Sequence, residues 1–180
     1  RYPRILKKSL SLLAICLASV QANAEPEVGA IRVLFLGHES EHHNSNKFYP
    51  MLAKGLGRDA IYFDYVTSVE EALGDAAYLG KFDAVLLYAN HGNITPEQWK
   101  NLKGYVEAGG GFVPVHCASW CFGNEPGFDQ LVGGRFASHK VGTFTAKVVD
   151  PKHPAMAGVK EFEAWDETYK HKNHNEKDRQ

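Results

Sequence analysis

Short apolar runs alternate with longer amphipathic stretches along most of this chain, and this alternation restricts the possible fold more than any other feature. The short runs have the length of buried strands, whereas the stretches between them show the spacing of helices. Strands separated by helical stretches of about 10–15 residues are typical of βαβ units with right-handed crossovers. The sequence therefore predicts an α/β fold of three layers, in which a mostly parallel sheet has helices on both faces.

The pattern predicts five strands and four helices. The strands are expected at residues 31–36, 61–66, 84–89, 112–115 and 143–149, and the helices at 47–57, 69–79, 95–108 and 127–132. The helix at 95–108 has the clearest boundaries, because Thr95 and Gln98 form a capping box around Pro96, and Gly109 ends it. Residues 170–180 are strongly polar and show no pattern of a strand or helix.

The first 24 residues have the parts of a secretory signal peptide. A basic start is followed by the apolar run Leu10–Val20 and by an A-x-A site that ends at Ala24. The apolar run is too short to span a bilayer core of about 30 Å as a helix. We therefore expect cleavage after Ala24, a periplasmic or secreted protein without a stable membrane anchor, and one domain over residues 25–180.

Charge and cysteine content exclude several classes of protein. Loss of the signal peptide would remove four basic residues and shift the net charge from −1 to −5, which leaves no dense basic patch for nucleic acid. Only Cys117 and Cys121 would remain, too few for a disulfide framework. These two cysteines could pair with each other if the turn between them is helical.

The segment GGGFVPVHC, residues 109–117, places an imidazole and a thiol at the end of a predicted strand. Ligands of parallel α/β sheets bind outside the carboxyl ends of the strands. Cys117 could be a nucleophile if its thiolate were stabilised, but a tight nucleophile elbow needs small flanking residues, and Val115 does not fit. We therefore favour His116 as an acid, a base or a substrate-binding group, and Cys117 as a packing residue or a partner for Cys121.

Residues 38–42 match the zinc-protease pattern H-E-x-x-H, which requires a helix. Here the pattern directly follows a strand, so we interpret it as a polar loop in which His38, His42 or His43 binds a ligand, or as a plain solvated loop. His91 follows another predicted strand and suits either a binding role or a turn. We expect no cofactor, although the nine histidines together with carboxylates leave a divalent metal as the alternative.

Four segments resemble the trehalose-utilisation, or ThuA-like, family, and the resemblance covers about residues 31–180. They are LFLGHESEHH (34–43), GGGFVPVHCAS (109–119), LVGGRFASH (131–139) and HPAMAGVKEFEAWDETY (153–169). The resemblance implies a class I glutamine amidotransferase-like, flavodoxin-like fold, and a role with disaccharides or keto-sugars of the trehalose type. Because the family's domain continues past the last segment, the chain is expected to lack the C-terminal part of its domain.

The resemblance and the residues together predict an exported sugar-processing enzyme. We expect His116, His139, Asp166 and Glu167 to act in acid–base catalysis, and a sugar to be held by His38, His42, His91, Trp120 and Tyr169. Glutamine amidotransferase activity is not expected, because the small residues of a cysteine elbow are absent around Cys117. The alternative is a non-catalytic carbohydrate-binding module of a larger exported protein.

Overall fold

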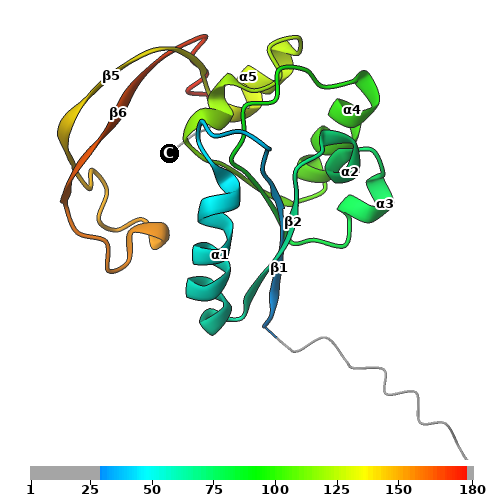
Figure 1. Ribbon diagram of the computed structural model, residues 1–180, viewed down its shortest axis with the longest axis horizontal. Helices are drawn as coiled ribbons and strands as arrows, with labels where there is room; N and C mark the ends of the chain where they lie inside the picture. Colours follow the sequence, from blue (N-terminus) through cyan, green and yellow to red (C-terminus); the bar gives the residue numbers. More distant parts are fainter. Residues whose placement is uncertain (1–28, 178–180) are drawn as a thin grey trace, which may run out of the picture.

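The computed structural model describes residues 29–177, so the expected signal peptide at residues 1–24 lies outside the described part of the chain. A four-stranded parallel sheet forms its centre (Figure 1). The strands are β1 (Ile31–Leu36), β2 (Ile61–Val66), β3 (Ala84–Leu87) and β4 (Gly111–Pro114), in the order β2-β1-β3-β4. All three pairings are parallel, which confirms the predicted α/β class.

Helices cover both faces of this sheet (Figure 1). One face carries α1 (Ser45–Leu56); the other carries α2 (Val69–Leu73), α3 (Ala76–Leu79) and α4 (Pro96–Glu107). The predicted capping box of α4 is present. The predicted helix over 69–79 is instead two short helices, because the Asp75 side chain accepts a hydrogen bond from the Ala77 N–H and starts a new helix.

The main core lies between the sheet and helices α2–α4. It contains Leu34 and Leu36 of β1, Leu102 of α4, and two phenylalanines, Phe122 and Phe128, all fully buried. On the opposite face, the buried Phe35 packs against aromatic rings of α1 and β2, namely Tyr49, Phe63 and Tyr65. The remaining helical segments are α5 (Pro126–Val132) and the 3₁₀ turns Gly57–Asp59, His116–Trp120 and Pro154–Met156. None of the described helices has the length and apolar character needed to cross a bilayer.

A long antiparallel hairpin extends beyond the parallel sheet (Figure 1). It consists of β5 (Arg135–Ala146) and β6 (Phe162–Lys172). The expected strand at 143–149 is therefore wrong at both ends, because β5 runs from Arg135 to Ala146, and the prediction of no strand within 170–180 is wrong for residues 170–172. Most hairpin residues are exposed or half-buried on both faces, so the strands lack the apolar pattern that marks a buried strand.

The base of the hairpin is held to α5 by a cluster of polar contacts around Asp129. Arg135 donates to an Asp129 carboxylate oxygen at 3.2 Å, and Asn173, just after β6, donates to the other at 2.9 Å. The Arg135 guanidinium also donates to the carbonyls of Trp120 and Cys121. The buried Asp129 carboxylate thus binds the start of β5 and the end of β6 to the α/β body.

Candidate active site

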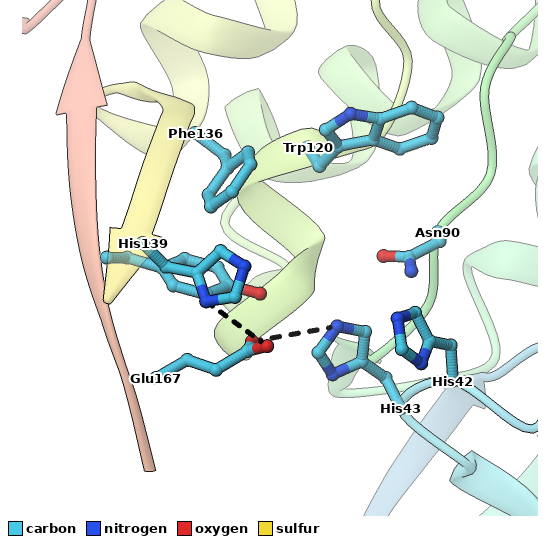
Figure 2. Close-up of a pocket in the computed structure, with 8 residues that line it drawn as sticks. His42, His43, Asn90, Trp120, Phe136, His139 and Glu167 are labelled. Carbon is cyan, nitrogen blue, oxygen red and sulfur yellow. Dashed lines mark ion pairs between the residues drawn. The ribbon is translucent and has the colours of Figure 1, made fainter. Parts of the chain in front are cut away.

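The hairpin meets the carboxyl ends of β1, β3 and β4 around a cavity of about 260 Å³ (Figure 2). Its lining combines imidazoles, an amide and a carboxylate with three aromatic rings. The lining residues are His42, His43, Asn90, Trp120, Phe136, His139, Glu167 and Tyr169. The cavity occupies the edge of the sheet where ligands of such folds bind.

The turn after β4 places His116 in a strained backbone conformation. Its φ of 51° lies in the left-handed region, which residues other than glycine seldom adopt. Strain of this kind persists where surrounding structure enforces it, and it concentrates at functional sites. His116, and not Cys117, therefore occupies the strained position that a nucleophile takes in an elbow turn. Cys117 lies one residue further along, in the 3₁₀ turn His116–Trp120.

Both described cysteines are free and buried, and they do not form a disulfide. Burial raises the pKa of each thiol to about 12. The Cys121 thiol also donates a hydrogen bond to the Ala89 carbonyl at 2.9 Å. Because the thiolate is the nucleophilic form, neither cysteine has the environment of a reactive thiol.

Residues 37–44 form an irregular loop, so the H-E-x-x-H pattern does not lie on a helix. The His38 side chain is buried beneath this loop and holds it through two hydrogen bonds. Its Nδ1 accepts a hydrogen bond from the Asn90 N–H at 3.1 Å. Its Nε2 therefore carries the proton and donates to the His43 carbonyl at 2.9 Å. This bond fixes the backbone at His43, whose φ of 52° is also left-handed. Thus His38 positions His43 instead of facing the cavity.

Glu167 lies at the centre of the histidine cluster, and its two oxygens face different partners (Figure 2). Oε1 is 3.3 Å from Nδ1 of His139. Oε2 is 3.9 Å from Nε2 of His43 and 3.8 Å from Nε2 of His116. One carboxylate from the hairpin therefore contacts histidines on both sides of the cleft.

The surroundings alter the acidity of two neighbouring groups. Burial, and secondly the charge of Glu167, raises the pKa of Tyr169, whose hydroxyl hydrogen-bonds the Glu167 carboxylate. Burial, followed by the proximity of His116, lowers the pKa of His43. At neutral pH the phenol thus stays protonated and the His43 imidazole stays neutral.

Five of the nine residues predicted for the site line the cavity: His42, Trp120, His139, Glu167 and Tyr169. His116 does not line the cavity itself, but it contacts three residues that do, namely His43, Glu167 and Tyr169. The Asp166 carboxylate is more exposed; its Oδ1 lies 3.7 Å from Nε2 of His116 and accepts from the Glu167 N–H.

Two predicted binding residues do not line the cavity. One is His38, described above, and the other is His91, which donates from Nε2 to the Gly37 carbonyl at 2.8 Å and stacks on Phe122. Sequence reasoning did not select Asn90 and Phe136, and it named His43 only as one of three loop histidines. The position in the sequence was the available signal, since Asn90 lies three residues after the end of β3 and Phe136 lies in the GGRF segment.

Comparison with known proteins gives one family and two structural neighbours. The family model for ThuA, described as trehalose utilisation, matches residues 32–179. A ThuA-like protein from Bacteroides uniformis ATCC 8492 has a similar structure, with a TM-score of 0.65, 20% identity, and coverage of 84% of this chain and 66% of that one. A ThuA-like protein from Parabacteroides merdae ATCC 43184 has a TM-score of 0.63, 17% identity, and coverage of 78% and 62%.

These neighbours establish similarity of fold, and the chain spans slightly less than two thirds of the length of each. No curated protein matches the sequence.

Proposed function

Because this chain belongs to the ThuA family of trehalose utilisation, we propose that it binds a disaccharide or keto-sugar of the trehalose type in this cavity and processes it by acid–base chemistry. The observation that carries the proposal is the His139–Glu167 pair, 3.3 Å apart, in a cavity with aromatic walls. An imidazole beside a carboxylate is a common proton-transfer pair, and aromatic rings pack against the apolar face of a sugar.

The lining suits a sugar ring. Trp120, Phe136 and Tyr169 supply aromatic surface, while Asn90 and His42 supply hydrogen-bonding groups for hydroxyls. A volume of about 260 Å³ lies just below the usual range for ligand pockets, which starts at roughly 300 Å³. One sugar unit would therefore be enclosed, with the rest of a disaccharide extending out of the cavity.

The arrangement of the acidic groups favours a keto-sugar. Hydrolysis of a glycoside uses two carboxyl groups on either side of the scissile bond, whereas Asp166 and Glu167 both lie next to the same imidazole of His116. Removal of a proton from a carbon beside a carbonyl needs a single base. His139 fits that role, since its Nδ1 faces Glu167 and its Nε2 remains for the substrate.

A binding module without catalysis is the second candidate, and the aromatic lining supports it equally well. Calorimetry with a panel of disaccharides and their keto forms, coupled to product analysis, separates the two. Binding and turnover are both expected. Binding without turnover by the purified protein would establish the module and refute the enzyme.

The His139 assignment has its own test. His139→Ala is expected to lower kcat by at least about 100-fold, the usual range for loss of a general acid or base. His153→Ala is the matched control, because His153 caps the 3₁₀ turn Pro154–Met156 and does not line this cavity. Unchanged turnover in His139→Ala would overturn the assignment.

We also propose that the protein is exported, with a periplasmic or secreted location. The basic start, apolar run and A-x-A site of residues 1–24 support this proposal. Amino-terminal sequencing of the protein from its host is expected to begin at Glu25. A protein that retains residues 1–24 would contradict it.

A further inference from the structure

Three side chains from distant parts of the sequence bring ligand atoms together on one side of the cavity. His43 comes from the loop after β1, His116 from the turn after β4, and Glu167 from β6. One ligand atom from each lies within 4.8 Å of the other two. We propose that these three residues bind one divalent transition-metal ion, such as zinc, with an open coordination position facing the cavity.

The donor set suits such an ion. Two imidazoles and one carboxylate are a common ligand set for zinc and other first-row metals, and three protein ligands leave a position for water or substrate. Metal–ligand bonds of about 2.0–2.2 Å place two ligands of one ion at most about 4.4 Å apart. The Glu167 Oε2 atom already lies 3.9 Å from His43 Nε2 and 3.8 Å from His116 Nε2. Small rotations of the side chains bring all three into range.

The backbone at both histidines supports a role beyond packing. Among the described residues, five other than glycine have positive φ, and His43 and His116 are two of them. The Nδ1 atom of His116 is also buried, with no hydrogen-bond partner among the described residues. The left-handed backbone at both histidines needs an explanation, and an ion held between their imidazoles supplies one, whereas the unpaired Nδ1 of His116 is not the atom that would bind the ion.

Neighbouring groups hold the proposed ligands in place. His38 donates to the His43 carbonyl, and Tyr169 hydrogen-bonds the Glu167 carboxylate. His139 faces the other oxygen of Glu167, so Oε2 remains directed at the two imidazoles. Outer contacts of this kind orient the ligands of metal sites. The site also leaves His139 available as the acid–base group, so the metal proposal goes beyond the proposed sugar function and does not depend on it.

Zinc itself is the probe for the test. The protein is treated with EDTA, dialysed and titrated with ZnCl₂ by calorimetry, and bound zinc is counted by elemental analysis. We expect one ion per chain with a Kd of about 1 μM or lower. We also expect zinc to raise the Tm, because an ion that binds only the folded state stabilises it. Zinc at less than about one tenth of an ion per chain would overturn the proposal.

Matched variants identify the ligands. His116→Asn and Glu167→Gln are each expected to weaken zinc binding at least about 100-fold; asparagine is chosen because it tolerates the left-handed backbone at residue 116. His42→Asn is the control, since His42 lines the cavity but is outside the proposed ligand set. Equal zinc affinity in Glu167→Gln and the unaltered protein would refute the site, even if His116→Asn failed to fold.

Zinc affinity and sugar binding can also be separated. Trp120→Ala is expected to weaken sugar binding without changing zinc affinity, because Trp120 lines the cavity but offers no ligand atom. Zinc affinity that falls as much in Trp120→Ala as in Glu167→Gln would contradict the assigned ligands.

Discussion

Glu167 Oε2 lies 3.8 Å from His116 Nε2, although Glu167 belongs to the antiparallel hairpin and His116 begins the turn after β4 of the parallel sheet. The cavity therefore exists only while the hairpin is docked on the α/β body. Its docking is supported by polar contacts around the buried Asp129, whose partners are the half-buried Arg135 and the exposed Asn173. Stability and function are linked through these contacts.

Asp129→Asn is expected to lower the free energy of unfolding by about 3 kcal/mol, the range for breaking a buried ion pair. The Asp129 and Arg135 side chains are only 8% and 18% exposed, so the arginine would lose its counter-charge in a poorly solvated place. Urea unfolding measures the change. Asp64→Asn is the control, because its pair with Arg32 is 52% exposed on both sides and should contribute below about 1 kcal/mol. Equal losses in the two variants would contradict this role of Asp129.

Glu167→Gln is expected to lower kcat by about 100-fold or more, because the carboxylate faces His139, His43 and His116 at once. Asp166→Asn serves as the neighbouring control. The Asp166 side chain is 56% exposed, whereas that of Glu167 is 22% exposed. Asp166→Asn should therefore lower kcat by less than about 10-fold. Steady-state kinetics on a keto-disaccharide makes the comparison. A larger loss in Asp166→Asn would reverse the roles of the two carboxylates.

Trp120→Ala is expected to weaken sugar binding by about 10-fold, the effect of losing roughly 1.4 kcal/mol of aromatic packing. Trp165→Ala is the matched control, since Trp165 is 72% exposed on the hairpin and does not line the cavity. Calorimetry with the best substrate of the panel measures both. Equal sugar affinities in the two variants would show that Trp120 does not contact the bound sugar.

The parallel sheet could be predicted from the sequence because its signals are local. The apolar runs of β1 to β4 and the capping box at Thr95 each depend on neighbouring residues alone. The hairpin was partly missed because its strands are exposed on both faces, so histidine and charged residues replace the apolar alternation. The approach of Glu167 to His43 depends on how that hairpin docks, and no local pattern encodes it.

The roles of the histidines show the same limit. His38, His91 and His116 all follow strands, so the sequence places them at one edge of the sheet. Which of them faces the cavity depends on hydrogen bonds to distant backbone groups, such as that from His91 to Gly37. Such partners are known only once the strands are packed together.

Iodoacetamide at pH 8 is expected to leave Cys117 and Cys121 unmodified in the folded protein. With a pKa of about 12, each thiol is ionised in only about one molecule in 10,000 at that pH, and both side chains are buried. Mass spectrometry should show both sites labelled after unfolding in guanidinium chloride. Rapid labelling of Cys117 in the folded state, with loss of activity, would instead identify Cys117 as a reactive nucleophile.

Acidification from pH 7 to pH 5 is expected to destabilise the protein through His91. Burial is the main cause that lowers the pKa of His91, although its bond to the Gly37 carbonyl opposes the shift. In the unfolded chain this imidazole takes up a proton near pH 6.5, whereas in the folded state it does so only at lower pH. Between these two pH values the unfolded state binds more protons, so stability falls as the pH falls.

Urea unfolding at pH 7 and pH 5 measures this dependence. His91→Gln keeps a donor for the Gly37 carbonyl but cannot titrate, so the loss of stability between the two pH values should be smaller than in the unaltered protein. His153→Gln, outside the cavity and away from the sheet edge, should leave the loss unchanged. If His91→Gln showed the same pH dependence as the unaltered protein, other groups would control the loss of stability in acid. His43 and His171 would then be the first to consider, because burial lowers their pKa values too.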